Sequence, residues 1–225
     1  MLKFYEAHKK QKALQKALKE DWQRSEPTLY PIQLSNNERA YLTAKFKKMT
    51  AGGGRVCYLE FGSGGSTFLA TLYSDLDITS VESSMQWIEH ITQWEILKNA
   101  IALGRLHIEH IDIGEVGDWG IPINDEKRAF YPEYSQRAFS FNKDFKLVFI
   151  DGRFRVACVL ATLYHCVKDT TILVHDFNNR PQYHRILEFV DIVDTCDTLA
   201  EFKIKDHLDK QRVQQVYEEF KYDCY

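Results

Sequence analysis

The sequence predicts an α/β protein with a seven-stranded, mostly parallel, doubly wound sheet and helices on both faces. Through the middle of the chain, short apolar runs alternate with amphipathic stretches, a pattern typical of parallel strands buried on both faces. Near the C-terminus, 186–193 and 199–205 are consistent with two strands joined by a short turn at 195–198. We therefore expect an antiparallel last strand.

A first helix is expected over residues 5–22. Leu14, Leu18 and Trp22 recur at four-residue spacing, and lysines occupy much of the remaining surface. This pattern fits either a cap helix with a solvated lysine face or a basic arm for an acidic partner or membrane surface. The narrow apolar stripe and the wide spread of lysines favour the cap helix.

A second helix is expected before the sheet begins. Ser35 and Glu38 match a capping box, in which each side chain satisfies a backbone amide of the other residue. The helix should run to about residue 50, where three glycines end it. We thus expect an N-terminal helical extension over 1–50 and the main domain over 51–225.

The elements of the main domain follow in order. Strands are expected at 56–60, 78–82, 106–111, 147–151 and 171–176, ahead of the C-terminal pair. Helices are expected at 66–73, 84–98, 154–167 and 209–222. The segment 112–146 is rich in aromatic residues and too long for a simple crossover, so its aromatic side chains either serve function or pack the segment onto the sheet.

Composition narrows the class of protein. Lys and Arg total 29 against 32 Asp and Glu, a net charge of −3, which disfavours a dedicated nucleic-acid binder. The five cysteines are scattered without a C-x-x-C, so neither a disulfide framework nor a zinc site is expected. The sequence shows neither a signal peptide nor an apolar run long enough to span a membrane, and a cytoplasmic location is the expectation.

The strongest chemical signal is a glycine-rich turn between the first strand and the next helix. The run Val56 to Thr67 contains Gly62-Ser63-Gly64-Gly65. Glycine permits positive φ and close approach of a ligand to the backbone, and the following helix offers free amides. Open α/β sheets bind nucleotides at this position.

Two acids flank this turn. Glu60 precedes Gly62, and Glu82 closes the second strand about 20 residues further on, the spacing of a ribose-binding acid. Glu82 has a simpler interpretation as an acid at a helix N-terminus, favoured by the helix dipole. The agreement of strand end, spacing and glycine turn favours the ribose role.

The run from Glu60 to Ser66 resembles the E/D-x-G-x-G-x-G loop of class I S-adenosylmethionine-dependent methyltransferases, with Ser66 in place of the third glycine. The dinucleotide-binding fingerprint fits less well. The position of its final glycine is Thr67 in this sequence, and the fingerprint has no acid before its first glycine, where this sequence has Glu60. The resemblance covers roughly residues 40–205.

The resemblance implies S-adenosylmethionine as the cofactor, and a role for each matching residue. Glu60 would orient the methionine amino end and Glu82 would bind the ribose. Asp112, just past the third strand, would approach the adenine amine, or is an ordinary loop acid. The remaining residues expected to line the cofactor are Gly62, Ser63, Gly64, Ser66 and Ser83.

Polar residues also end the fourth and fifth strands. The strand ends that carry Asp151, His175 and Asp176 resemble those of small-molecule O-methyltransferases, in which strands four and five end in acids that face the methyl donor. These three side chains could accept a proton from the substrate. Alternatively, Asp151, Asp176 and Asn178 could hold a divalent cation, although Asp-Phe-Asn departs by one residue from the Asp-Asn pair of metal-dependent relatives. Asp151 and Asp176 could also simply cap the helices that follow.

We therefore expect methyl transfer from S-adenosylmethionine to a small-molecule acceptor, with an oxygen nucleophile preferred. Two alternatives stay open: a non-catalytic relative that binds a nucleoside, and an NAD-dependent oxidoreductase on a similar sheet. A homo-oligomer is compatible with the sequence.

Overall fold

The computed structural model describes residues 2–21, 30 and 32–225, and it is built around one seven-stranded sheet. The strands are β1 (Cys57–Phe61), β2 (Asp77–Glu82), β3 (Leu106–His110), β4 (Phe145–Ile150), β5 (Thr171–Val174), β6 (Val190–Cys196) and β7 (Leu199–Ile204). Their order is β3-β2-β1-β4-β5-β7-β6, and only β7 runs antiparallel to its neighbours. The predicted fold class is confirmed.

The strand order creates a switch point between β1 and β4, from which the chain winds in opposite directions. Ligands of open α/β sheets bind beyond the carboxyl ends of the strands at such a point. The order also differs from the 3-2-1-4-5-6 arrangement of dinucleotide-binding sheets, because an antiparallel strand is inserted between β5 and β6.

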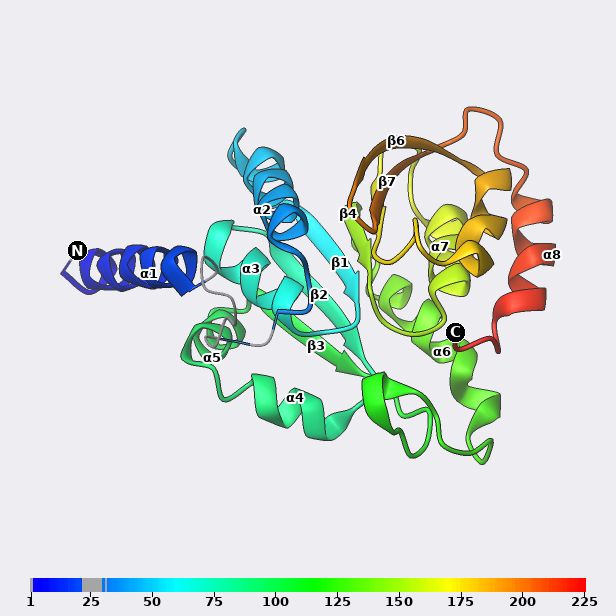
Figure 1. The fold of residues 1–225 in the computed structure, drawn as a ribbon, viewed down its shortest axis with the longest axis horizontal. Coiled ribbons are helices and arrows are strands. Elements are labelled where there is room, and N and C mark those ends of the chain that lie inside the picture. Colours follow the sequence, from blue (N-terminus) through cyan, green and yellow to red (C-terminus); the bar gives the residue numbers. More distant parts are fainter. Residues whose placement is uncertain (1, 22–29, 31) are drawn as a thin grey trace.

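Helices cover both faces of the sheet (Figure 1). They are α1 (Leu2–Asp21), α2 (Asn36–Thr50), α3 (Gly65–Tyr73), α4 (Met85–Ile91), α5 (Glu95–Ala102), α6 (Tyr131–Gln136), α7 (Arg155–His165) and α8 (Lys210–Phe220). Side chains of β4 alternate between the two faces: Leu147 and Phe149 join the core beneath α2, α3 and α5, whereas Val148 and Ile150 join the core beneath α7 and α8.

The N-terminal helices pack into the same core as the sheet. The Ser35–Glu38 capping box is present, and Leu42 and Phe46 of α2 are fully buried. In α1, Leu18 is buried while the lysines of residues 9–19 are exposed, as a cap helix requires. Trp22 lies outside the described residues. The domain boundary at residue 50 stays a prediction. Among the described helices, none has the length and apolar character needed to cross a membrane.

The helix predicted over 84–98 is wrong in one respect, because it is two helices, α4 and α5. Trp94 has an extended backbone and forms the N-cap of α5. Its ring packs edge-on against Tyr30 and Phe68, with centroids 5.0 and 5.9 Å apart. Tertiary packing of this tryptophan therefore accounts for the interruption that helical periodicity does not predict.

Two strand predictions also need correction. The segment Pro181–Glu188 is a 3₁₀ helix that buries Tyr183 and Ile186, so β6 begins only at Val190. The apolar run predicts a fifth strand that reaches Asp176, but the strand ends at Val174. Asp176 has φ of 57°, a left-handed conformation that a strand does not accommodate.

Candidate active site

A cavity of about 1070 Å³ lies at the carboxyl ends of the central strands. That volume is at the upper end of small-molecule sites, so it has room for more than one small ligand. The cavity is lined by the glycine turn, the end of β2, the 117–121 loop, the tips of β4 and β5, and two residues ahead of α2. The sequence-predicted residues in this lining are Gly62, Ser63, Gly64, Ser66, Glu82, Ser83, Asp151, His175 and Asp176.

The glycine turn presents bare backbone to this cavity. Gly62 has φ of 94°, and a Cβ there would lie 2.7 Å from the backbone nitrogen of Gly152, so only glycine fits between the β1 and β4 tips. Gly64 has φ of 155°, and a Cβ there would approach the Trp87 ring at 3.6 Å. Trp87 donates its indole N–H to the Ser63 carbonyl at 2.8 Å, which holds the ring beside the turn.

Glu82 organises the backbone around the turn. Its Oε1 accepts the amides of Ser83 and Ser84 at 2.7 and 2.9 Å, and its Oε2 accepts the Ser63 amide at 3.1 Å. Burial raises the pKa of Glu82, although these hydrogen bonds oppose the rise. A carboxylate has about four acceptor positions, so Oε2 retains capacity for a ligand hydroxyl group.

Glu60 lies beneath the turn rather than in the cavity lining. Its carboxylate is fully buried and accepts hydroxyls from Tyr58 at 3.0 Å, Ser66 at 2.8 Å and Ser80 at 2.7 Å, together with Thr67. Burial raises its pKa to about 7, against the lowering effect of these hydroxyls. Glu60 therefore supports the glycine turn from below, through the first residues of α3.

Asp112 is not part of the cavity lining. It is about half exposed, it pairs with Lys127 and it accepts the Gly114 amide at 3.1 Å. The hydrogen bond from Lys127 holds the pKa of Asp112 below its usual value. This is the environment of a loop-stabilising acid, and the adenine role stays a prediction.

A charged cluster occupies the tips of β4 and β5. His175 Nδ1 lies 2.8 Å from Asp151 Oδ1, and Arg155, which is almost fully buried, lies 3.2 Å from Oδ1 of Asp151 and 3.2 Å from Oδ2 of Asp176. Arg180 adds a second contact to Asp176 at 3.0 Å. Both contacts to Asp151 use Oδ1, so Oδ2 has no hydrogen-bond partner among the described residues.

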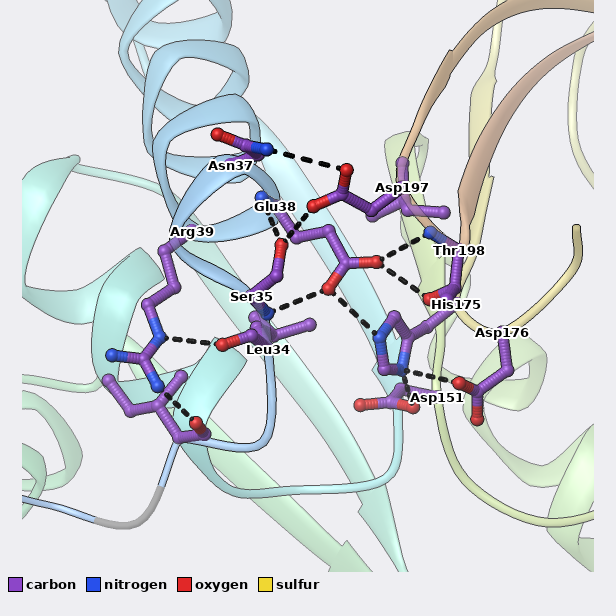
Figure 2. Close-up of polar contacts among 12 residues, drawn as sticks. Leu34, Ser35, Asn37, Glu38, Arg39, Asp151, His175, Asp176, Asp197 and Thr198 are labelled. Carbon is purple, nitrogen blue, oxygen red and sulfur yellow. Dashed lines mark hydrogen bonds and ion pairs between the residues drawn. The ribbon is translucent and has the colours of Figure 1, made fainter. Parts of the chain in front are cut away.

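Glu38 also belongs to this cluster, although the sequence pattern around it predicts only a helix cap. Figure 2 shows its carboxylate between His175 and Thr198. Its Oε2 lies 3.4 Å from His175 Nε2, and its Oε1 accepts the Thr198 amide at 3.0 Å and hydroxyl at 2.6 Å. The capping box signal located Glu38 on α2, but no local pattern indicates that α2 packs against β5 and the β6–β7 turn.

The two carboxylates make His175 a doubly hydrogen-bonded ring. A donor at each nitrogen requires the protonated imidazolium form. Burial lowers the pKa of His175, but Asp151, Asp176 and Glu38 outweigh it and raise the pKa overall. Conversely, burial raises the pKa of Asp151, but His175, Arg155 and Arg153 outweigh it and lower the pKa overall. Neither nitrogen of His175 is free to contact a ligand.

The donor set does not fit a resident divalent cation. Ligand atoms of Asp151, His175 and Asp176 lie within 4.8 Å of one another, but both carboxylates already neutralise Arg155. Asn178, the third predicted ligand, is absent from the cavity lining and donates its amide to the Asp197 carbonyl at 2.8 Å. Buried guanidinium supplies the positive charge that a metal would bring.

The capping alternatives for the two aspartates are wrong. The N-cap of α7 is Phe154, which makes no side-chain cap bond, and the N-cap of the 3₁₀ helix after β5 is Arg180. In the 112–146 segment, packing onto the sheet is confirmed for some aromatic residues, and a functional role for the others stays a prediction. Trp119 lines the cavity and is 71% exposed, whereas Tyr131 and Phe139 pack onto the sheet.

No family model and no curated protein matches this sequence, so the comparisons rest on solved structures. A methyltransferase-like protein from Silicibacter pomeroyi is 27% identical, with a TM-score of 0.73 over 86% of this chain and 98% of that one. A Podospora anserina methyltransferase with SAH bound is 15% identical, with a TM-score of 0.53 over 77% and 80% of the two chains. A Geobacter sulfurreducens methyltransferase is 10% identical, with a TM-score of 0.51 over 78% and 82%.

These similarities agree with the observed topology and with the glycine turn placed between β1 and α3. The bare backbone of the turn, above buried Glu60, is the arrangement that the resemblance to the E/D-x-G-x-G-x-G loop predicts. By its strand order and by its similarity to the methyltransferase-like protein from Silicibacter pomeroyi, the chain has the fold of the class I S-adenosylmethionine-dependent methyltransferases.

Proposed function

We propose that this protein methylates an oxygen nucleophile of a small molecule, with the donor nucleoside across the tips of β1 and β2 and the acceptor against the tips of β4 and β5. The observation that carries the proposal is the division of one cavity into two chemically different ends. One end has bare glycine backbone and Glu82, and the other has Asp151 with an unpartnered oxygen.

At the donor end, Glu82 supports the proposed ribose contact. Three backbone amides fix its carboxylate at the edge of the glycine turn. A preordered carboxylate can accept ribose hydroxyls without paying further conformational entropy. Trp87, fixed by its bond to Ser63, offers an aromatic face beside the turn. S-adenosylmethionine supplies an electrophilic methyl group on sulfonium, so the protein has only to position the acceptor and exclude water.

At the acceptor end, Asp151 orients the nucleophile. Oδ1 is fixed by His175 and Arg155, and Oδ2 remains to accept a hydrogen bond from an acceptor hydroxyl. As the new O–C bond forms and the S–C bond breaks, the hydroxyl proton passes to Oδ2 or to water. His175 does not contact the acceptor, because both of its nitrogens are engaged, and it acts by holding Asp151.

Isothermal titration calorimetry with S-adenosylhomocysteine and with NAD tests the donor assignment. We expect the first to bind at one site per chain and NAD to show no saturable heat. Glu82→Ala should weaken S-adenosylhomocysteine by about 10- to 100-fold, the cost of losing buried hydrogen bonds to a charged acceptor. Exposed Glu126→Ala is the matched control and should bind as the parent does. Failure of the parent protein to bind would contradict the proposal.

A screen of small metabolites with a methyl-labelled donor tests the transfer itself. Label should appear on a hydroxyl-bearing small molecule. Donor binding without transfer to any acceptor would favour a non-catalytic nucleoside-binding relative, and label on nitrogen or carbon would correct the nucleophile.

A further inference from the structure

Three arginines stand at the β4 and β5 end of the cavity, and they differ in how their charges are compensated. Arg155 contacts Asp151 and Asp176, each at 3.2 Å, and Arg180 contacts Asp176 at 3.0 Å. Arg153 has no carboxylate within ion-pair distance among the described residues. The two aspartates are therefore in direct contact with Arg155 and Arg180, whereas Arg153 interacts with Asp151 only at longer range and forms no ion pair of its own.

Arg153 is nevertheless almost entirely withdrawn from solvent. It is 8% exposed, and its Nε is buried without a hydrogen-bond partner. It also lines the cavity. Burying a cation without a partner is strongly unfavourable, so this arrangement indicates that a partner arrives from outside the protein.

The surroundings of Arg153 restrict where that partner can bind. Its Cγ lies 3.9 Å from the position that a Cβ on Gly120 would take, so the stem packs under the 117–121 loop. Glu82, which also lines the cavity, accepts the backbone amides of Ser63, Ser83 and Ser84 and makes no ion pair with Arg153. Asp118, on the 117–121 loop, also lines the cavity, and no ion pair joins it to Arg153 among the described residues. Because the stem lies under this loop, an anionic partner can reach the guanidinium from within the cavity.

The geometry points to Arg153 as a binding site for an anionic oxygen group, a carboxylate or a phosphate, on a ligand in this cavity. A guanidinium donates two parallel N–H bonds to such a group, and the bonds are strengthened by charge. Two sources of the group are compatible with the cavity: the amino-acid carboxylate of the donor, and an acid group on the acceptor. The inference rests on the proposed function for the identity of the ligands, but not for the charge of the site.

Two ligand pairs distinguish the sources. Calorimetry compares S-adenosylhomocysteine with 5′-methylthioadenosine, which lacks the amino-acid tail, on the parent protein, Arg153→Gln and Arg153→Lys. Inorganic phosphate and benzoate are then titrated with and without S-adenosylhomocysteine, and the rise in melting temperature is recorded. Arg137→Gln, which removes an exposed arginine paired with Glu133 outside the cavity, is the matched control.

We expect Arg153→Gln to lose about 10- to 100-fold in affinity for one class of anion. If S-adenosylhomocysteine weakens while 5′-methylthioadenosine does not, the source is the donor carboxylate. If only phosphate or benzoate loses its stabilising effect, the source is the acceptor. Arg153→Lys should fall between, because it keeps the charge but not the paired donors.

Equal binding of all four ligands by Arg153→Gln and by the parent would overturn the inference. Stability separates a binding role from a structural one. Arg153→Gln should fold with a melting temperature at least equal to that of the parent, because it removes a buried charge that has no ion-pair partner. A marked fall in melting temperature would mean that Arg153 is held by contacts within the fold. A parent that binds neither nucleoside would reject the proposed function, while the two anion titrations would still test Arg153.

Discussion

The two ends of the cavity hold their carboxylates in opposite ways. At the β1 and β2 end, neutral donors surround Glu60 and Glu82, and burial raises the pKa of both. At the β4 and β5 end, cations surround Asp151, and charge lowers its pKa despite burial. Neutral donors suit a site that binds the uncharged hydroxyl groups of a ligand, whereas charge pairing keeps Asp151 ionised and fixed in orientation.

The largest expected effect tests the charged end. Asp151→Asn removes the proposed hydrogen-bond acceptor and base while keeping the side-chain volume. We expect the rate of methyl transfer to fall by about 10²- to 10⁴-fold, while the affinity for S-adenosylhomocysteine, measured by calorimetry, changes little. Comparable losses in both quantities would mean that the two ends are not separable.

Glu60→Gln tests the neutral end through the pH dependence of folding stability. The native pKa of Glu60, about 7, exceeds its unfolded value, so the folded state binds the extra proton and stability falls as pH rises from about 4.5 to 7. That loss is on the order of 3 kcal/mol. Glu60→Gln should flatten this part of the profile in urea unfolding. If the unfolding free energy of Glu60→Gln depended on pH between 5 and 8 as that of the parent does, the raised pKa of the buried Glu60 carboxyl would be contradicted.

A further variant tests whether α2 belongs to the charged end. Glu38→Gln keeps an acceptor for Thr198 but removes the charge facing His175. Hydrogen bonds and His175 lower the pKa of Glu38 despite its burial, so its contribution is lost as pH falls through that lowered pKa. The pKa of His175 is raised, so the contribution of its protonated form is lost as pH rises through that pKa.

The destabilisation by Glu38→Gln, about 1–3 kcal/mol, should therefore peak near pH 5–6 and shrink at pH 9. Urea unfolding at three pH values measures it, and Asn37→Ala, an exposed neighbour on α2, provides the control. A destabilisation that does not vary with pH would mean that Glu38 acts only as a helix cap.

The sequence predicted the neutral end of the cavity better than the charged end, because the residues of the neutral end lie closer together along the chain. The glycine turn and Glu82 follow one another along the chain, so strand, turn and spacing together located them. Glu38 and His175 are 137 residues apart, and only the packing of α2 against the end of the sheet brings them together. Similarly, the ring of Trp94 interrupts a helix through contacts with Tyr30 and Phe68 that periodicity does not contain.

Removal of divalent metal is expected to have no effect on activity. Because Arg155 already pairs with both aspartates of the candidate metal group, a chelator should leave methyl transfer unchanged within error. The assay compares activity before and after treatment with EDTA, and again after Mg²⁺ is restored. Loss of activity that Mg²⁺ restores would show that a metal displaces the arginine pairing.

The most direct test of the central claim is a crystal structure of the protein with S-adenosylhomocysteine. The two-ended cavity predicts that the ribose hydroxyls contact Glu82, that the tail passes over Gly62 and Gly64, and that Oδ2 of Asp151 stays open to an acceptor. A nucleoside bound elsewhere, or a ribose that does not touch Glu82, would contradict the account.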